Sequence, residues 1–463
     1  MIYIELPNSI VKNFVGETAM TEYTNQLMLF KGLSDKKVQA DFNGGQITSD
    51  AGVLLLRETE SKLGLCKRMA LVLRDRRHAS YVQHDLSQLL TQRVFQIICG
   101  YEDANDCNEL RLDPLFKLGC EKLPGSTDLL ASQPTMSRFE NAPSYTDLYR
   151  MGCGLVDAFC DSYTKPPEAI VLDIDDTDDP TYGDQQLSLF NAHYDTWCYQ
   201  PLHVFEGSSG KLISSILRPG KRPTGQQIAS ILEHIVKRIK KHWPQVQVLL
   251  RGDSHFCCPE TLALCEEYNI KFVLGLAGNN ILLRMADSLM AKARELFESS
   301  GEPVKIYSEF SYQAGTWDNP YRVIVKAEYN EKGANTRFIA TNLLSAHRTF
   351  VYEHIYCARG AMELMIKELK NHLFSDRTSC SSFHANQFRL FLHSMAYIIL
   401  HALREKYLAG TELAQAEFST IRLKLLKVGA RVIQMATKIK IHLASGCPSK
   451  HLFYHIYLQA CSP

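Results

Sequence analysis

The pattern of hydrophobic and polar residues divides the chain into a mainly helical first part and a later part in which strands and helices alternate. Over about residues 41–165, apolar residues recur at helical spacing, as Leu90 and Val94 do in a helix predicted at about 85–98. From Ala169 onward, short apolar runs alternate with helical repeats. Three strands (169–175, 201–206 and 211–217) precede a helix (228–239), a strand (246–250), a helix (259–265) and a strand (271–276). This order predicts an α/β fold.

The segment of about 278–342 interrupts the alternation of strands and helices. A helix is predicted at about 281–297, and alternating apolar and polar residues such as those of 321–329 predict strands after it. We therefore expect a strand-rich insertion in this part of the chain. A long helix is predicted to follow over about 349–372.

The charge of the chain is close to balanced, but the charges are unevenly distributed. The 51 Lys and Arg residues against 50 Asp and Glu give a formal net charge of +1, which by itself argues against a nucleic-acid-binding protein. However, residues 418–463 contain no Asp or Glu, whereas they contain Arg422, Lys424, Lys427, Arg431, Lys438, Lys440 and Lys450. Such a stretch is suited to a phosphate backbone; the alternative is a solvated helix face. A second basic patch contains Lys237, Lys240 and Lys241.

Several classes of protein are disfavoured by the composition. A hydrophobic fraction of 45% with 22% charged residues is typical of a globular protein. The 14 cysteines include no Cys-x-x-Cys pair, so we expect no structural zinc site. Residues 1–17 do not resemble a signal peptide, and the longest apolar stretch, 391–403, is too short to span a bilayer. We expect a cytoplasmic protein without a membrane partner.

Five carboxylates follow the first predicted strand of the α/β part: Asp173, Asp175, Asp176, Asp178 and Asp179. Clustered like charges raise each other's pKa unless a cation lies among them, so the cluster suggests a divalent metal held by oxygen ligands. Three interpretations remain open. The first is a solvated acidic turn, and the second is a phosphatase of the haloacid-dehalogenase type with Asp173 as its nucleophile. The third is a two-metal phosphodiester enzyme, which needs carboxylates from distant parts of the chain.

Asp253 is a carboxylate far from the cluster in the sequence, and it stands at the end of another predicted strand. It is therefore a candidate for the second metal ligand of a two-metal enzyme. A phosphatase of the dehalogenase type usually has a further Asp shortly after this point, where this chain has Cys257 and Cys258. The phosphatase interpretation is therefore weakened.

The long helix predicted at 349–372 places four functional side chains on one stripe. At 100° per residue, Tyr356, Arg359, Glu363 and Lys370 fall within about 60° of arc. Glu363 is suited to complete a metal site with Asp175 and Asp253, and the two cations are suited to bind phosphate. The alternative is a solvated charged face, which is common on long helices.

Together these residues resemble bacterial insertion-sequence transposases of the DDE superfamily. The four residues of the long helix match the signature Tyr-(2)-Arg-(3)-Glu-(6)-Lys of one branch position for position. Three further strings, 41–57, 100–103 and 132–141, are similar to one subgroup of these transposases. The last of them, which begins Ser-Gln-Pro-Thr-Met-Ser-Arg-Phe, also resembles the start of a helix-turn-helix recognition helix, although an ordinary Pro-started helix is the alternative.

The resemblance covers the chain from about residue 40 to its end, and it implies the fold of this part. It implies a ribonuclease-H-like α/β catalytic core with a strand-rich insertion and a mainly helical N-terminal DNA-binding region. The expected divisions are an N-terminal segment without a clear prediction (1–40), the helical DNA-binding region (41–165), the first part of the core (166–277), the insertion (278–342), the last part of the core (343–403) and a basic DNA-binding or dimerisation region (404–463).

The resemblance also implies an activity and its residues. The catalytic and metal-binding triad is expected to be Asp175, Asp253 and Glu363, with Asp173 as the alternative first carboxylate and two Mg²⁺ (or Mn²⁺) ions as cofactors. Tyr356, Arg359 and Lys370 are expected to bind DNA phosphates, and Trp317 either stacks on a flipped base or belongs to the core. His255 departs from the glycine that the family often has at this position.

The implied substrates are the terminal inverted repeats of a mobile element and a target, both double-stranded DNA. Branch members typically form a hairpin at the element's end, and cutting two ends in one complex needs at least a homodimer. Two alternatives remain, namely the phosphatase and a non-catalytic DNA-binding descendant of a transposase.

Overall fold

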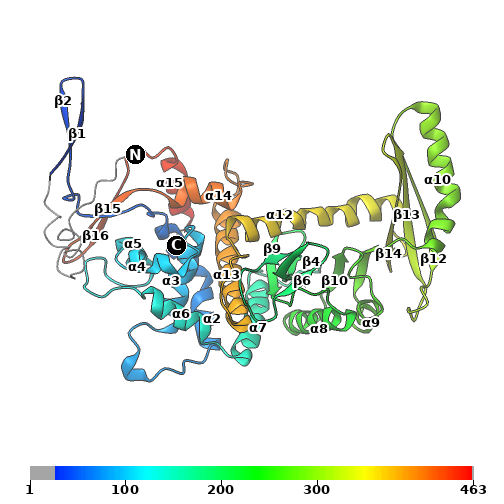
Figure 1. Cartoon of the computed structure of the whole chain (residues 1–463), viewed down its shortest axis with the longest axis horizontal. Coiled ribbons are helices and arrows are strands. Elements are labelled where there is room, and N and C mark those ends of the chain that lie inside the picture. Colours follow the sequence, from blue (N-terminus) through cyan, green and yellow to red (C-terminus); the bar gives the residue numbers. More distant parts are fainter. Residues whose placement is uncertain (1–26, 461–463) are drawn as a thin grey trace, which may run out of the picture.

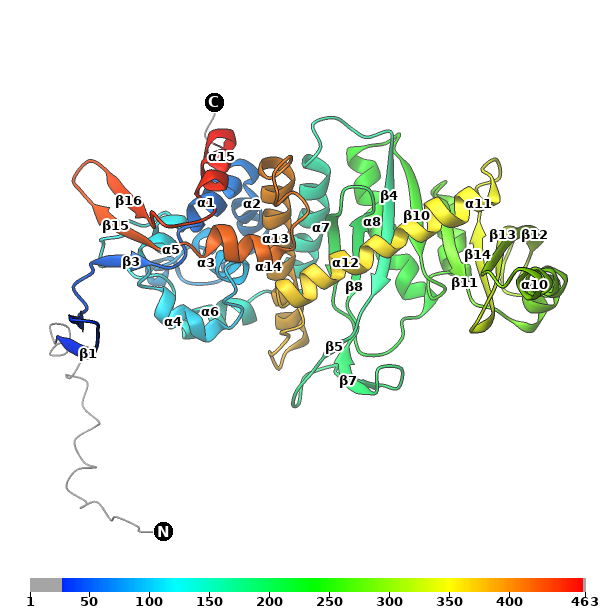
Figure 2. The ribbon, with the colours of Figure 1, turned by 90° about the horizontal axis from the view of Figure 1, so that it is seen from above.

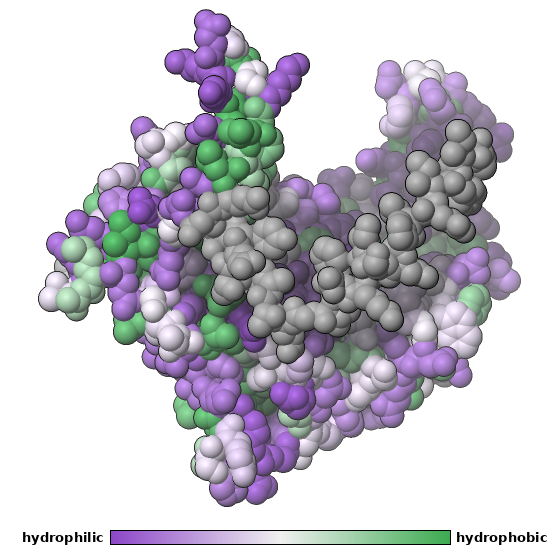
Figure 3. Space-filling view, turned by 60° about the vertical axis from the view of Figure 1, so that its left-hand side comes forward, coloured by the Kyte–Doolittle hydropathy of each residue, from purple (hydrophilic) through white to green (hydrophobic). Residues whose placement is uncertain are grey.

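The computed structural model describes residues 27–460, so most of the segment 1–40, for which no structure was predicted, lies outside the described residues. Its described part is a two-stranded hairpin of β1 (Met28–Leu33) and β2 (Lys36–Ala40). The hairpin projects from the molecule with exposed apolar side chains such as Leu29 and Phe30 (Figures 1 and 3). It is followed by the short strand β3 (Gln46–Thr48).

Helices form the next part of the chain, as their apolar periodicity predicts. They are α1 (Val53–Leu63), α2 (Leu65–Val72), α3 (Leu86–Ile98), α4 (Cys107–Leu110), α5 (Pro114–Gly119), α6 (Gln133–Asn141) and α7 (Tyr145–Asp161). Asp85 caps α3 by accepting a hydrogen bond from the backbone N–H of Gln88, and a capping box of Ser144 and Asp147 starts α7. The string that resembles the start of a recognition helix forms α6, whose Met136 and Phe139 are buried.

A large mixed sheet has the strand order β12-β13-β14-β11-β10-β4-β8-β9. Its strands are β4 (Ala169–Asp176), β8 (Leu202–Glu206), β9 (Lys211–Ile216), β10 (Gln247–Gly252), β11 (Lys271–Leu276), β12 (Val304–Tyr312), β13 (Tyr321–Asn330) and β14 (Gly333–Thr341). Strands β4, β10 and β11 are parallel, and the other pairs are antiparallel. With α8 (Gly225–His242) and α9 (Pro259–Glu267), the predicted order of strands and helices is confirmed.

The insertion extends the large sheet. After α10 (Asn280–Ser300), strands β12, β13 and β14 continue the sheet because β14 pairs with β11. Helix α10 packs against these strands at one end of the molecule (Figure 1). The insertion contains the predicted helix and strands, but its strands do not form a sheet of their own.

The two faces of the sheet have different chemistry because successive residues of a strand point to opposite sides. In β4, Ile170, Leu172 and Ile174 join the apolar core that contains residues of α8 and α9. Asp173 and Asp175 point to the other face. That face is crossed by the long helical segment labelled α11 and α12 in Figure 2.

This long segment is helical over residues 348–372, as predicted, but its hydrogen bonding is not uniform. It consists of α11 (Arg348–Phe350), a π-helical stretch (Val351–Tyr356), a 3₁₀ turn (Cys357–Gly360), α12 (Ala361–Lys367) and a second π-helical stretch (Glu368–His372). Because π and 3₁₀ turns hold different numbers of residues, a rotation of 100° per residue describes the stripe only approximately.

A second, small sheet was not predicted from the sequence. Strands β5 (Asp179–Pro180), β7 (Thr196–Tyr199) and β6 (Leu189–Asn191), in that spatial order, lie between β4 and β8 in the chain. These strands are only two to four residues long, which is too short for a clear alternation of apolar and polar residues.

The last part of the chain returns to the N-terminal helices. Helix α13 (Phe383–Tyr407) contacts α1, α3 and α7 as well as β9. It is followed by α14 (Phe418–Ile421), a π-helical stretch (Arg422–Leu426), β15 (Ala430–Gln434), β16 (Ile439–Leu443) and α15 (Lys450–Ala460). Strand β15 pairs with both β16 and β3. Within residues 27–460, no helix combines the length and the apolar character needed to cross a membrane.

Candidate active site

Asp173 is buried in an ion pair inside the fold. Its side chain is 0% exposed, and its two carboxylate oxygens accept hydrogen bonds from Nε and Nη2 of Arg251, each at 2.6 Å. The remaining Nη1 of Arg251 donates to the Ile355 carbonyl oxygen at 2.8 Å. The pair thus ties β4 and β10 to the long helical segment above them. This placement disfavours Asp173 as the first catalytic carboxylate, because the side chain is fully buried and both of its oxygens are bound by a buried guanidinium.

Asp175 and Asp253 meet at the ends of neighbouring parallel strands. The register pairs Asp173 with Arg251, so two residues further on Asp175 lies beside Asp253. Burial raises the pKa of Asp175 to about 6; Arg359 opposes this rise and the negative charge of Asp253 adds to it. Nη1 of Arg359 donates to Oδ2 of Asp175 at 2.7 Å. Two carboxylates from distant parts of the sequence therefore lie together under one arginine.

Asp176 adds a third carboxylate that the sequence analysis did not assign. Burial raises its pKa to about 6, with Arg218 opposing and with Asp175 and Asp253 reinforcing the rise. Its Oδ2 has no hydrogen-bond partner among the described residues, and the nearest cation-forming atom is Nδ1 of His255 at 3.4 Å. The sequence offers no signal that separates Asp176 from the four other aspartates of the cluster. Arg218 follows β9, and the pairing of β9 with β8 and of β8 with β4 brings it close to Asp176 only after folding.

The signature residues of the long helical segment lie close to the strand ends, with one exception. A Cβ atom placed at Gly275 would lie 2.7 Å from the Tyr356 hydroxyl oxygen and 2.8 Å from the backbone nitrogen of Ser254. The Tyr356 hydroxyl therefore lies beside the loop after Asp253. Nζ of Lys370 donates to the carbonyl oxygen of Asp178 at 2.6 Å and to its Oδ1 at 2.9 Å. Tyr356, Arg359 and Lys370 are thus brought together with the acidic strand end.

Glu363 is the exception. Its side chain is exposed and makes no hydrogen bond or ion pair with any other residue of the described range. It lies four residues, about one helical turn, after Arg359. Glu363 is therefore on the correct helix and near the site, but it does not contact Asp175 or Asp253.

Asp179, the last aspartate of the cluster, makes contacts that stabilise the fold. Asp179 is buried at the start of β5, and its Oδ2 accepts a hydrogen bond from the Thr378 hydroxyl at 3.1 Å. Burial raises the pKa of Asp179 well above its usual value. The five neighbouring aspartates therefore occupy different environments, and Asp175 and Asp176 are the two whose pKa is raised by the charge of Asp253.

Trp317 lies inside the core of the sheet. It is 6% exposed, and its ring packs edge-on against Tyr312 and Tyr321 at centroid distances of 5.6 and 5.5 Å. A ring enclosed in this way offers no open face to a DNA base. The structure therefore favours the core interpretation of Trp317 over the predicted stacking role.

The basic residues of α8 lie away from the carboxylates. Helix α8 covers the opposite face of the sheet, so Lys237, Lys240 and Lys241 are separated from Asp175 by the sheet itself. Lys237 forms an ion pair with Glu233 at 2.7 Å, Lys240 donates to the backbone carbonyl of Tyr268, and Lys241 is exposed.

The basic C-terminal residues divide into two groups. Arg422 donates to the backbone carbonyls of Ile98 and His372, and Lys427 forms an ion pair with Asp50 at 2.7 Å; both have structural contacts. The exposed basic residues are Lys424, Arg431, Lys438, Lys440 and Lys450. Only this second group presents its charge to solvent.

A divalent cation fits the chemistry of the strand ends. No three His, Cys, Asp or Glu side chains of the described chain lie close enough together to hold a metal ion as they stand. However, Asp175 and Asp253 are neighbouring carboxylates, and a cation between them would favour the ionised form of Asp175, whose pKa is raised by burial and also by the charge of Asp253. The unpaired Oδ2 of Asp176 is a further oxygen donor nearby. Two carboxylates are thus in place, and the third predicted ligand, Glu363, is one turn away from Arg359.

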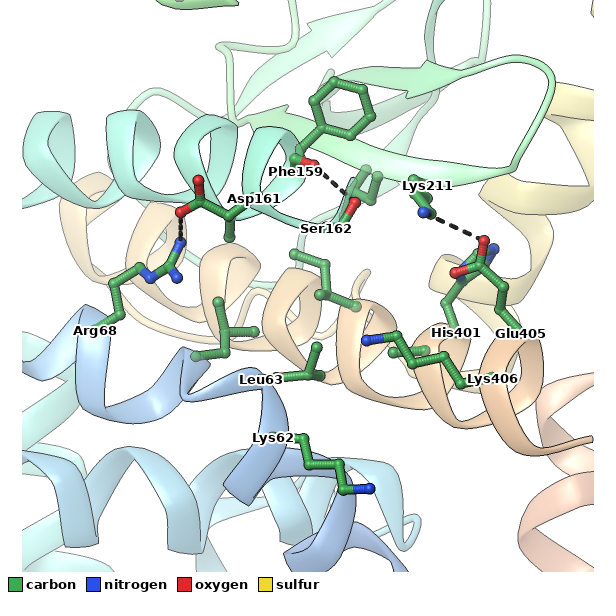
Figure 4. Close-up of a pocket in the computed structure, with 15 residues that line it drawn as sticks. Lys62, Leu63, Arg68, Phe159, Asp161, Ser162, Lys211, His401, Glu405 and Lys406 are labelled. Carbon is green, nitrogen blue, oxygen red and sulfur yellow. Dashed lines mark hydrogen bonds and ion pairs between the residues drawn. The ribbon is translucent and has the colours of Figure 1, made fainter. Parts of the chain in front are cut away.

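A cavity in another part of the molecule is lined by none of the carboxylates or signature residues described above. It has a volume of about 190 Å³ and lies between α1, α2, α7, β9 and α13 (Figure 4). Charged residues of its lining are paired, Arg68 with Asp161 at 2.7 Å and Lys211 with Glu405 at 3.3 Å. We assign no role to this cavity.

Comparison with known proteins identifies the family of the chain. The family model described as "Transposase DDE domain group 1" matches residues 30–462. A comparison with curated protein sequences gives no match. Among solved structures, the piggyBac transposase synaptic complex with hairpin DNA is similar with a TM-score of 0.39 and 10% identity, over 81% of this chain and 77% of that chain. Because the family model covers nearly the whole sequence, the chain belongs to the DDE-domain transposases of group 1.

Proposed function

We propose that this transposase binds the terminal inverted repeats of a mobile element, cuts the DNA at the ends of the element and joins those ends to target DNA. The observation that carries the proposal is the hydrogen bond from Arg359 to Asp175. It holds the helix with the transposase signature directly over two carboxylates that come from separate strands. This arrangement brings phosphate-binding cations and metal-binding carboxylates to one place, as phosphodiester chemistry requires.

The proposed catalytic triad is Asp175, Asp253 and Glu363. These carboxylates would hold divalent cations, with Mg²⁺ or Mn²⁺ as the candidates and two ions as the proposed number. The bound metal would supply activation of water or of a DNA 3′-hydroxyl and stabilisation of the leaving oxygen. The convergence of Asp175 and Asp253 supports this assignment, and the exposed position of Glu363 leaves its carboxylate free to take part.

Arg359, Lys370 and Tyr356 are proposed to hold the DNA backbone. The guanidinium of Arg359 suits two oxygens of a phosphate, and the ammonium of Lys370 acts as a point charge. In the absence of DNA both cations bind aspartates of the cluster, which keeps them in place beside the site. The Tyr356 hydroxyl, next to the backbone of Ser254, is suited to position the loop that carries Asp253. We also propose a hairpin intermediate at the element's end.

The central strands support a ribonuclease-H-like core. Strands β9, β8, β4, β10 and β11 are adjacent in that order; β4, β10 and β11 are parallel, and β8 is antiparallel to both of its neighbours, β4 and β9. We propose that this five-stranded part is the catalytic core and that residues 41–165 together with the exposed C-terminal cations bind duplex DNA. Cutting both ends in one complex requires a homodimer.

The structure makes the phosphatase alternative less favourable. A nucleophilic aspartate must reach its substrate, whereas Asp173 is fully buried and both of its oxygens are bound by Arg251. A non-catalytic DNA-binding descendant has no need of Asp175, Asp253 and Glu363 together. Cleavage experiments separate this last alternative from the proposal.

The test is incubation of the full chain with DNA that carries the element's terminal inverted repeats, with Mg²⁺ or Mn²⁺. The wild type is expected to cut at the element's end, and Asp175→Asn, Asp253→Asn and Glu363→Gln are each expected to abolish cutting while DNA binding persists. Glu353→Gln is a matched control, because Glu353 is an exposed glutamate on the same helical segment. Cutting by Glu363→Gln at the wild-type rate would refute the proposed triad, and DNA binding without cutting by the wild type would favour the non-catalytic alternative.

A further inference from the structure

The small sheet beside the carboxylates carries two exposed aromatic side chains. Phe190 of β6 and Trp197 of β7 are directly opposed in the strand register, with ring centroids 6.2 Å apart and planes inclined by 65°. Trp197 is 57% exposed and Phe190 50%, whereas the other two tryptophans of the chain, Trp243 and Trp317, are each 6% exposed. Two adjacent exposed aromatic rings form an apolar surface that is suited to contact a partner. Figure 2 shows β5 and β7 projecting from the body of the molecule.

The small sheet is connected directly to the active site. Strand β5 begins at Asp179, the last residue of the acidic cluster, and pairs with β7. The turn between β6 and β7 contains Tyr194, whose pKa is raised to about 12. Burial is the largest cause of this rise, and the charges of Asp176, Asp178 and Asp175 contribute to it. The aromatic pair therefore stands on a sheet whose turn lies near the carboxylates of the site.

Two cations lie on a loop that packs against the same sheet. A Cβ atom placed at Gly220 would lie 2.1 Å from the Cys198 carbonyl oxygen of β7. The loop therefore approaches the strand more closely than any residue with a side chain allows. The Asn191 side chain of β6 donates to the Gly220 carbonyl at 3.0 Å. The next residues, Lys221 and Arg222, are exposed, and the charge of Arg222 contributes to lowering the pKa of His255, which burial lowers most. Positive charge thus lies beside the small sheet, and the charge of Arg222 also acts on His255, two residues after Asp253.

We propose that Trp197 and Phe190 form a stacking platform for an unpaired base of the DNA substrate, with Lys221 and Arg222 binding the adjacent phosphates. Exposed aromatic rings next to cations are the combination by which proteins hold single-stranded DNA, since rings stack on bases and cations neutralise the backbone. The inference rests on the proposed function, because a duplex must be locally opened before an unpaired base is available. The two cations favour a polyanion over an apolar protein partner as the occupant.

Tryptophan fluorescence of the full chain provides a test that does not depend on cleavage. In EDTA, a forked oligonucleotide with unpaired bases is expected to quench the emission of Trp197 and to protect it from acrylamide, whereas a blunt duplex is expected to do so less. Trp197→Ala is expected to remove this signal and to weaken binding of the forked DNA at least about fivefold. Trp197→Phe is expected to restore most of the affinity because phenylalanine also stacks.

A matched control is Tyr457→Ala, which removes an aromatic ring of similar exposure, 53%, from α15. This variant is expected to bind forked DNA as the wild type does. Equal binding by Trp197→Ala and the wild type would overturn the proposal. Acrylamide protection of Trp197 that rises with protein concentration in the absence of DNA would also overturn it, in favour of an interface between two copies of the chain.

The two proposals fail in different ways. If the wild type cuts inverted-repeat DNA but forked DNA leaves Trp197 unprotected, the stacking platform is refuted and the transposase activity stands. If forked DNA protects Trp197 but no cutting occurs with Mg²⁺ or Mn²⁺, the proposed catalysis is refuted and the platform stands.

Discussion

Replacing Asp173 by asparagine tests whether this aspartate is structural or catalytic. In the wild type, the guanidinium of Arg251 is 5% exposed and two of its nitrogens donate to Asp173. An asparagine offers one acceptor and turns an N–H group toward one of these nitrogens. The change therefore leaves a buried positive charge without its counter-ion and sets two donors against each other.

The expected loss of stability is large. Removing one partner of a buried ion pair typically costs about 3–5 kcal/mol, although the intact pair adds little net stability because both charges are desolvated. The Asp173 pair fits this description, since burial raises the pKa of Asp173 despite the opposing charge of Arg251. For a domain of about 200 residues, each kcal/mol corresponds to a shift of about 2–4 °C, so the melting temperature is expected to fall by about 6–20 °C.

The assay is thermal unfolding in EDTA at pH 7.5, with Asp175→Asn as the matched control two residues away. Burial raises the pKa of Asp175 to about 6, so its ionised form is disfavoured in the folded protein and an amide removes this cost. The lost hydrogen bond from the partly exposed Arg359 acts in the opposite direction. We expect Asp175→Asn to change the melting temperature by less than about 3 °C.

An Asp173→Asn protein as stable as the wild type would refute the structural assignment. The same protein without cutting activity would then restore Asp173 as a candidate catalytic residue. Conversely, Asp173→Leu combined with Arg251→Met is expected to recover most of the lost stability, because replacing both partners by apolar side chains removes the unpaired charge. Failure of this double variant to recover stability would show that the cost lies in packing and not in charge.

Two further predictions concern DNA binding and pH. Replacing the exposed Arg431 and Lys438 together by alanine is expected to weaken DNA binding and to lower the salt slope of log K by about 2, whereas Lys332→Ala, on the hairpin of β13 and β14, leaves the slope unchanged; an unchanged slope in the double variant would refute the phosphate role. Burial raises the pKa of Glu60 to about 7, so ionisation of this side chain destabilises the fold as the pH rises from about 4.5 to 7. Glu60→Gln is therefore expected to add up to about 3 kcal/mol to the free energy of unfolding at pH 8 and almost nothing at pH 4.5 in urea titrations; equal effects at both pH values would contradict the assigned cause.

The sequence by itself determined the central part of the fold and most of the candidate site. The apolar strand β4 with Asp175, the strand β10 that precedes Asp253 and the long helix with Arg359 all have strong local periodicity, which depends on few residues outside each element. The signature spacing also identified the side chains of the helix that approach the strand ends. These features are local, so the order of residues is sufficient to predict them.

Only the tertiary structure decided which of several chemically identical residues belong to the site. The five aspartates of the cluster cannot be told apart by composition, yet Arg251 encloses Asp173 and leaves Asp175 beside Asp253. The three tryptophans cannot be distinguished either, although only Trp197 is largely exposed. The physical reason is that burial and charge pairing depend on partners from distant parts of the chain. Asp173 and Arg251 are 78 residues apart, and Asp175 and Arg359 are 184 apart, so these contacts exist only after folding.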